Sequence, residues 1–314
     1  MPSLPRIAVV TDSTACLVDE VDGVTVVPIT MIVSGTPHDD PTPHDDPTPH
    51  DDPTPHDDPT PHEDPIPHPN QAPPASFDPT ALGSGSGSGS ASTSRPSPAR
   101  FAACYAALAE SGVTAVASIH LSAEMSGTVD SARAAARDAA IPVEVIDSRS
   151  IGMGLGYPVL AAARAAAAGA SLETVTSAAR RCATSTRTYF YVDTLDNLRR
   201  SGRIGAAARL LGSALMIKPL LHIVDGQISL LEKVRTATRA IARLEDLAVQ
   251  AAGDGPVELA VQHLAARPRA EALAERLRKR LPALADLQVV EVGPVIGVHV
   301  GPGMLGLTIT PHTS

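Results

Sequence analysis

The chain has 314 residues, of which 43% are hydrophobic and 2% aromatic, and it contains no Trp. This length suffices for one large or two ordinary domains, and the core must be aliphatic. Few aromatic rings are available to stack on nucleic-acid bases, which argues against single-stranded nucleic-acid binding. The formal net charge of −9 arises in residues 36–68, where ten acidic residues and no Lys or Arg occur. The rest of the chain is nearly neutral, so we expect no basic face that would bind nucleic acid.

Cysteine usage and the first residues indicate a cellular compartment. Cys16, Cys104 and Cys182 lie far apart and form neither a CxxC motif nor a zinc pattern, which suits a reducing environment. The first apolar run, residues 7–10, is too short for a signal sequence or a membrane span. We therefore expect a soluble, cytoplasmic protein that needs no cofactor and no bound metal.

Residues 37–69 form a low-complexity repeat of the unit PTPHDD, with a histidine at every sixth position. In a polyproline II helix these histidines would line one face and could bind Zn²⁺ or Ni²⁺ loosely. The favoured interpretation is a disordered expansion, because an acidic, Pro-rich and apolar-poor segment cannot offset its ordering entropy. A Gly/Ser tether follows at residues 83–90. We expect residues 36–92 to be an insertion in a loop.

Outside this insertion, the first half alternates strands with helices. We expect strands at 6–13, 24–33, 113–121 and 143–148, and helices at 97–112, 127–140 and 154–170. Ser97 is a candidate N-cap, Pro98 suits the first helical position, and Gly112 is a stop signal. The order predicts an α/β domain over residues 1–170 with a doubly wound parallel sheet.

The second half mixes hairpins with helices and predicts an α+β domain over residues 171–314. We expect helices at 171–186, 196–215, 236–253 and 268–281, and strands at 188–194, 257–264, 287–293 and 306–310. The helical stretch is expected to break near Ser201-Gly202. Between 219 and 235, two apolar runs are joined by Asp225-Gly226, a dipeptide that suits a tight hairpin.

Polar clusters follow three of the N-terminal strands, at residues 11–14, 122–128 and 147–148. Ligands of parallel sheets bind outside the carboxyl ends of the strands, so these clusters predict one pocket there. The alternative is that Asp and Ser simply cap the helices that follow.

The second cluster lies in the segment HLSAEMSGTVDSA, residues 120–132, which carries Ser122, Ser126 and Thr128. It lacks the Gly-x-Ser-x-Gly pattern of a nucleophile elbow and the Lys of a P-loop. A hydrolase would also need a base beside Ser126, and we interpret His120 as structural. What remains is a hydroxyl-rich loop at a helix N-terminus, where backbone amides and the helix dipole favour an anion.

Two further segments carry candidate anion-binding groups. A second hydroxyl loop at 92–97 contains Thr93 and Ser94. Arg203 lies between two glycines, Gly202 and Gly205, just after the expected helix break. An Arg in this position suits a bidentate carboxylate contact, although it also fits a surface charge on a helix. His299 lies beside a Gly-Pro-Gly turn, where backbone can approach a ligand.

Eight motifs in order, spanning nearly the whole chain outside the insertion, resemble the DegV family. They are IAVVTDSTACL, TSRPSPARF, LSAEMSGTVDSARAAA, VIDSRSIGMGLG, VDTLDNLRRSGRIG, ALMIKPLL with VDGQI, KVRTATRA and GVHVGPGMLG. Members of this family are two-domain α/β proteins that hold one long-chain fatty acid, such as palmitate. Some are the acyl-carrying subunit of a bacterial fatty acid kinase. The resemblance implies a lipid-binding protein rather than an enzyme, with the ligand at and beneath the domain interface.

Residue by residue, the resemblance places the carboxylate on Thr93 and Ser126, with Arg203 and His299 nearby. The resemblance also implies that Arg235 faces an ATP-dependent kinase subunit. Ser94, Ser122 and Thr128 complete the expected ligand-binding set. The family often has Lys-Thr-Ser-Gln-Pro where this chain has Ser-Thr-Ser-Arg-Pro, so Arg95 adds charge near the head group.

The resemblance also places the acyl chain in an aliphatic tunnel of the N-terminal domain, and exchange of such a ligand implies transient membrane contact. Two other classes stay open from the sequence. One is a serine hydrolase or phosphoryl-transfer enzyme that uses the Ser-Gly-Thr loop. The other is a metal-buffering protein that acts through its histidine row.

Overall fold

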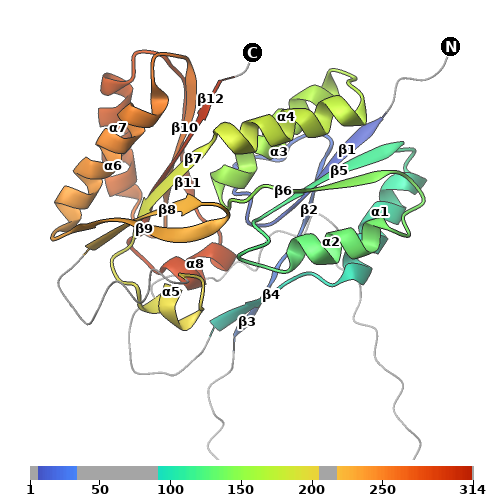
Figure 1. Cartoon of the computed structure of the whole chain (residues 1–314), viewed down its shortest axis with the longest axis horizontal. Helices are drawn as coiled ribbons and strands as arrows, with labels where there is room; N and C mark the ends of the chain where they lie inside the picture. The colour runs from blue at the N-terminus through green and yellow to red at the C-terminus, as the bar shows by residue number, and fades with distance from the viewer. Residues whose placement is uncertain (1–5, 34–90, 205–217, 313–314) are drawn as a thin grey trace, which may run out of the picture.

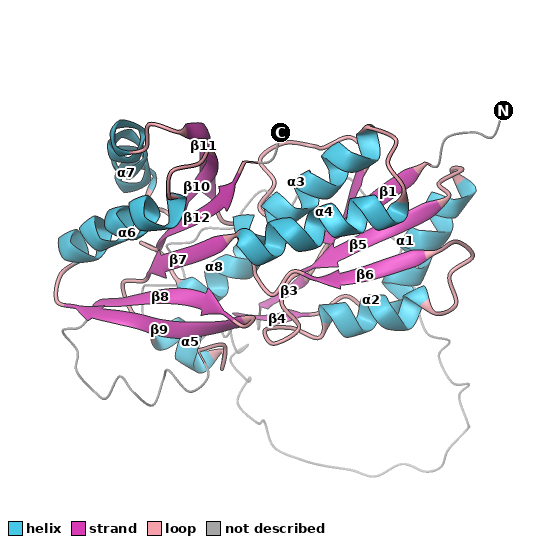
Figure 2. Ribbon diagram, turned by 45° about the horizontal axis from the view of Figure 1, so that its top comes forward, coloured by secondary structure: helices cyan, strands magenta, loops and turns pink. Residues whose placement is uncertain are grey.

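The computed structural model describes residues 6–33, 91–204 and 218–312 (Figure 1). The PTPHDD repeat, the Gly/Ser tether and the second part of the predicted helix at 196–215 lie outside these ranges. Two large sheets stand next to each other, each covered by its own helices (Figure 2).

The first sheet has four parallel strands, which confirms the predicted doubly wound arrangement. Its order is β2-β1-β5-β6, formed by Val24–Val27, Ile7–Asp12, Ala115–His120 and Val143–Asp147. Helices α1 (Pro98–Glu110) and α2 (Thr128–Ala136) cover one face, and α3 (Met153–Ala167) and α4 (Leu172–Ser185) cover the other (Figure 1). Both faces are buried, as a parallel sheet requires.

Local signals set the two ends of α1 as predicted. The Ser97 hydroxyl accepts a hydrogen bond from the Arg100 amide at 3.3 Å, and Pro98 opens α1. Past its end, Gly112 takes a φ of +85°, which a residue without Cβ adopts freely. Ser171 caps α4 in the same way through the amide of Thr174.

The second sheet has six strands in the order β11-β10-β12-β7-β8-β9. They are formed by Leu284–Glu291, Val257–His263, Leu305–Pro311, Arg187–Tyr191, Lys218–Val224 and Gln227–Val234. Only β10 and β11 pair in parallel; the other neighbours are antiparallel. Helices α6 (Ala237–Ala252) and α7 (Arg267–Arg280) cover one face over an aliphatic core. The β8–β9 hairpin turns at Asp225 and Gly226, with φ of +50° and +81°, as predicted.

Three features differ from expectation. The predicted strand 24–33 is split at Pro28, which has no backbone N–H for a ladder, and its second half forms β3 (Thr30–Val33). Strand β3 pairs antiparallel with β4 (Ala91–Ser94), where we expected a loop. Helix α8 (Pro294–Val300), which carries His299, was not predicted; it begins directly after Gly293.

The position of α4 is relevant to where the chain divides into two domains. This helix packs against α3, β5 and β6 of the first sheet, although it follows the proposed boundary at residue 170. That boundary stays a prediction. Within the described ranges, no helix is long and apolar enough to cross a membrane.

Candidate functional site

A cavity of about 380 Å³ lies where the carboxyl-end loops of the four-stranded sheet meet the six-stranded sheet, β4 and α8. Most of its apolar lining comes from the second sheet with α5 (Asp196–Arg200) and α8. These residues include Phe190, Leu198, Ile223, Ile228, Ile296 and Met304. The first sheet contributes fewer apolar side chains, so this cavity differs from the aliphatic N-terminal tunnel that we expected.

Six polar or charged residues predicted from the sequence line this same cavity. They are Thr93, Ser94, Arg95, Ser126, Arg203 and His299. They come from four separate parts of the chain, namely β4 and the residues after it, the loop before α2, the turn after α5, and α8. Among the described residues that line the cavity, none is acidic. The cavity therefore combines positive charge and hydroxyl groups with an apolar wall.

Thr93 and His299 are joined directly, with 3.1 Å between Thr93 Oγ1 and His299 Nε2. Burial and, to a smaller extent, the positive charge of Arg203 together lower the pKa of His299 to about 4. The imidazole is therefore neutral near pH 7 and carries one N–H. Its Nδ1 is buried and makes no hydrogen bond within the described part of the chain, so this atom is available to a ligand or water.

Ser126 lies in the turn before α2, and its hydroxyl contacts that of Thr128 at 2.9 Å. The amide of Ser126 donates to the carbonyl of Ser122, which closes the turn. Helix α2 then starts after Gly127 without a side-chain cap. Its first amides are therefore not used by a capping side chain, and such groups attract negative charge.

Arg95 lies close to this loop. A Cβ placed on Gly127 would lie 2.1 Å from Arg95 Nη1, so a larger residue there would displace the guanidinium. Arg203 is exposed, and its Nη1 donates to the carbonyl of Ser201 at 2.5 Å. Two guanidinium groups thus border a cavity that has no acidic lining residue.

Three residues of the predicted site lie elsewhere. Ser122 is fully buried and donates to the carbonyl of Gly226 at 2.7 Å, in the β8–β9 turn. Thr128 is also fully buried and reaches the cavity only through its contact with Ser126. Arg235 lies on another surface, beside α6. Neither Ser122 nor Thr128 lines the cavity. The sequence pattern predicted a loop rich in hydroxyl groups, but it does not determine which of these hydroxyls face the cavity.

The three polar clusters at the ends of the parallel strands lie together, but the predicted single pocket holds only in part, because Thr14 and Ser126 line the cavity and Asp147 and Ser148 do not. Asp12 Oδ2 accepts from the amide of Leu121 at 3.0 Å, and Asp147 Oδ1 accepts from the amide of Ala123 at 3.3 Å. The amide of Gly152 donates to the carbonyl of Thr14. Hydrogen bonds thus connect the loops that follow β1, β5 and β6 at one edge of the sheet.

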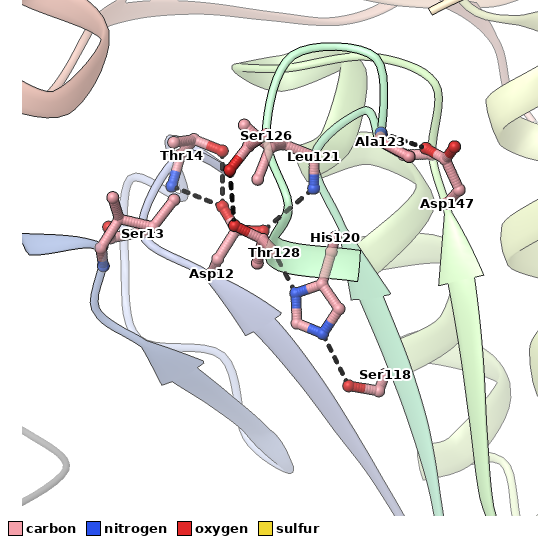
Figure 3. Close-up of polar contacts among 12 residues, drawn as sticks. Asp12, Ser13, Thr14, Ser118, His120, Leu121, Ala123, Ser126, Thr128 and Asp147 are labelled. Atoms are coloured by element: carbon pink, nitrogen blue, oxygen red, sulfur yellow. Dashed lines mark hydrogen bonds and ion pairs between the residues drawn. The ribbon is translucent and has the colours of Figure 1, made fainter. Parts of the chain in front are cut away.

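A buried polar chain lies under this edge (Figure 3). Ser118 Oγ is 2.7 Å from His120 Nε2, His120 Nδ1 is 3.1 Å from Asp12 Oδ2, and Asp12 Oδ1 accepts from the Thr14 hydroxyl at 2.5 Å. The order Ser-His-Asp resembles a catalytic triad, but all three side chains are fully buried and none lines the cavity. His120 is a structural histidine, in agreement with its interpretation from the sequence.

Sequence reasoning missed part of the lining. Gln262 and Thr188 line the cavity from β10 and β7. Both lie in apolar strand patterns that gave no functional signal. Within the described ranges, no group of three or more His, Cys, Asp or Glu is placed to hold a metal ion.

The fold and the cavity define an α/β protein with two sheets and a binding site between them that suits a negatively charged amphiphile. A family model described as "Uncharacterised protein, DegV family" matches residues 86–312. A DegV domain-containing protein of Streptomyces coelicolor is 57% identical over 216 residues, which are 69% of this chain and 77% of that protein. A second, from Mycobacterium bovis, is 44% identical over 214 residues, 68% of this chain and 76% of that protein. The chain belongs to the DegV family.

Solved structures of the family share the fold. A Thermus thermophilus DegV family protein, described for its fatty acid binding, superposes with a TM-score of 0.79 at 27% identity, over 98% of this chain and 100% of the other. DegV of Bacillus subtilis, a fatty acid binding protein, gives 0.75 at 28% identity, with the same coverage.

Proposed function

We propose that the protein binds one long-chain fatty acid, such as palmitate, non-covalently in this cavity. The carboxylate lies at Thr93 and Ser126, with Arg203 and His299 beside it. The observation that carries this proposal is the composition of the cavity, in which guanidinium and hydroxyl groups share one space with an apolar wall. The two solved relatives described as fatty acid binding proteins support it.

The apolar wall supplies most of the affinity in this proposal. Transfer of each methylene from water contributes roughly 0.8 kcal/mol, so a palmitate-length chain contributes on the order of 10 kcal/mol before ordering costs. The polar groups then fix the orientation of the ligand. Small-molecule sites commonly combine such a wall with a few well-placed polar groups.

Electrostatics favour a carboxylate at the polar end. The uncapped N-terminus of α2 and the guanidinium of Arg95 both present positive charge to the same loop. Two positive groups so close are stabilised when an anion lies between them. Because His299 is neutral, it recognises the carboxylate by donating a hydrogen bond rather than by its charge.

An enzymatic role for Ser126 is disfavoured by its neighbours. The hydroxyl contacts Thr128, which is no base, and the imidazole of His120 is already engaged by Asp12 and Ser118. His299, the histidine that lines the cavity, pairs with Thr93 and makes no hydrogen bond to Ser126. A serine nucleophile needs a base within hydrogen-bond reach. The cavity therefore suits binding, and any chemistry on the carboxylate falls to a partner. We propose an ATP-dependent fatty acid kinase subunit as that partner, with Arg235 on the surface that faces it.

Native mass spectrometry of the purified full chain tests the binding proposal. We expect a mass increment equal to one long-chain fatty acid, which is lost after delipidation and restored by palmitate. Protein that carries no increment and does not take up palmitate or oleate would overturn the proposal. Turnover of acyl esters by this chain alone would instead support the hydrolase.

A further inference from the structure

The cavity has a second polar region, separate from the groups proposed to hold the carboxylate. Gln262 on β10 and Thr188 on β7 both line it, and both are more than nine-tenths buried, with 2% and 7% of their surface exposed. Both are linked to Thr308 on β12, which is fully buried. Gln262 Nε2 donates to Thr308 Oγ1 at 2.9 Å, and Thr308 Oγ1 lies 3.1 Å from Thr188 Oγ1.

The orientation of the Gln262 amide is fixed by its other contact. Its Oε1 accepts a hydrogen bond from the Met153 amide at 2.8 Å, at the first residue of α3. An amide oxygen accepts and an amide nitrogen donates, so Nε2 must be the atom that points toward Thr308. Glycines allow this close approach, because a Cβ on Gly152 would lie 2.3 Å from Gln262 Oε1, and one on Gly154 would lie 2.8 Å from Thr188 Oγ1.

A count of hydrogens shows that this cluster is under-used. The amide of Gln262 carries two hydrogens and each threonine hydroxyl carries one, while the two bonds within the cluster use one hydrogen each. One unused hydrogen remains on Gln262 Nε2 whichever way the threonine pair is arranged. Within the described part of the chain, Nε2 makes no hydrogen bond other than the one to Thr308, and a buried donor hydrogen without a partner is costly.

We infer that the cluster of Gln262, Thr188 and Thr308 is a second polar subsite, which binds an oxygen atom carried along the acyl chain. The ligand class is then a long-chain acid with one hydroxyl or keto group on its chain. Such an oxygen accepts the unused hydrogen of Gln262, and a hydroxyl can also pair with Thr188. The inference rests on the proposed function, since it assumes that the same cavity holds the acid.

The hydrogen-bonding site favours the oxygenated acid over the plain one for a physical reason. A buried polar group that pairs with the right ligand is left unpaired by an analogue without the oxygen. The carboxylate end is unaffected, because Thr93, Ser126 and His299 make no hydrogen bond to this cluster. Recognition therefore depends on the position of the oxygen along the chain.

The test is displacement of a fluorescent fatty acid from the delipidated full chain. The competitors are octadecanoic acid and a series of monohydroxy-octadecanoic acids in which the hydroxyl moves along the chain. We expect one or two adjacent isomers to bind about fivefold to tenfold tighter than the others. The variant T188V, which has nearly the same shape, is expected to lose this preference while it still binds octadecanoic acid. T188S keeps the hydroxyl and should keep the preference.

Two further variants test whether the preference depends on this cluster. Q262M deletes the donor itself and is expected to lose the preference as T188V does. T310V is the matched control, because Thr310 is a buried threonine on the same strand as Thr308 that contacts Thr186 and does not line the cavity. It should leave the preference unchanged.

The outcomes separate this inference from the proposed function. Binding of octadecanoic acid with no preference among the isomers, or a preference that survives both T188V and Q262M, overturns the subsite alone. Failure of every acid to bind overturns both. A preference that is lost only in T188V and Q262M establishes the subsite.

Discussion

Ser122 Oγ donates a 2.7 Å hydrogen bond to the carbonyl of Gly226, which joins the loop after β5 to the tip of the β8–β9 hairpin. Both residues are buried. Gly226 has a φ of +81°, and a Cβ there would lie 2.6 Å from Ser122 Oγ, so the contact requires glycine on two counts. Around it, Gln227 donates to Glu124, and Arg149 pairs with Asp225. The hairpin of one sheet is therefore fixed to the cavity loop of the other.

The first prediction concerns this contact. S122A removes the donor to Gly226 and leaves a buried carbonyl unpaired, which lowers the free energy of unfolding by about 1–2 kcal/mol. Because Ser122 does not line the cavity, the affinity for palmitate should stay within about twofold of the parent. Urea unfolding of delipidated protein measures the first effect and a displacement titration the second.

S126A is the matched comparison, since it is the same change four residues later in a position that lines the cavity. It should cost less than about 0.5 kcal/mol of stability and weaken palmitate binding. If S122A instead abolished binding at unchanged stability, the role assigned to Ser122 would be wrong.

Much of the fold could be predicted because local chemistry determined it. The cap at Ser97, the glycine after α1 and the Asp225-Gly226 turn each act over a few residues. Helix α8 could not be predicted in this way. It has only seven residues, in a stretch rich in Pro and Gly, and so short a helix depends on tertiary packing rather than on its own propensity.

The candidate site was predicted only where its residues belong to local motifs. Thr93, Ser126, Arg203 and His299 lie in loops or polar motifs that stand out in the sequence, and they line one cavity. Gln262 lies in an apolar strand, and its role depends on pairing with Thr308, 46 residues later. Long-range register decides such contacts, and no local pattern reports it.

The second prediction concerns the head group. R203A and T93V should each weaken palmitate binding about tenfold or more, because a charged hydrogen bond contributes about 1.5–3 kcal/mol. Methyl palmitate, which carries no charge, should bind the parent and R203A alike. R137A is the control, since Arg137 is exposed at the end of α2 and does not line the cavity. Equal losses for the acid and the ester would contradict an electrostatic role.

The third prediction is a loss of stability in mild acid. Burial lowers the pKa of His222, His263 and His299, and that of His299 to about 4. The unfolded chain then binds more protons than the folded one below the ordinary histidine pKa of about 6.5. Stability is therefore complete above this pH and falls as the pH drops from about 6.5 toward 4.

The contribution of His299 should reach about 1 kcal/mol at pH 5.5, after allowance for solvent screening. Urea midpoints at several pH values measure the total effect, and H299Q should show a smaller acid loss than the parent. Identical pH profiles for the two proteins would show that His299 has the same pKa in the folded and the unfolded chain.

The fourth prediction concerns the buried carboxylate of Asp12, which accepts hydrogen bonds from the amides of Thr14 and Leu121, the Thr14 hydroxyl and His120. D12N replaces one acceptor oxygen by an NH₂ group that faces donors. We expect a loss of about 2–4 kcal/mol in unfolding free energy. The exposed Asp130 on α2 provides the control, since D130N should change stability by less than about 0.5 kcal/mol.

The last prediction tests the partner surface proposed around Arg235. This residue is exposed outside the cavity, on a surface where Lys233, Arg239 and Arg243 outnumber the acidic Glu232 and Asp246. R235E reverses one charge on this basic surface, so it should slow phosphorylation of bound palmitate by an ATP-dependent fatty acid kinase at least tenfold. Palmitate affinity should not change, because no cavity residue is altered. R133E, on the exposed side of α2, reverses a charge far from this surface in the chain and should leave the rate unchanged. Equal losses in R235E and R133E would point to net charge rather than to a docking contact at Arg235.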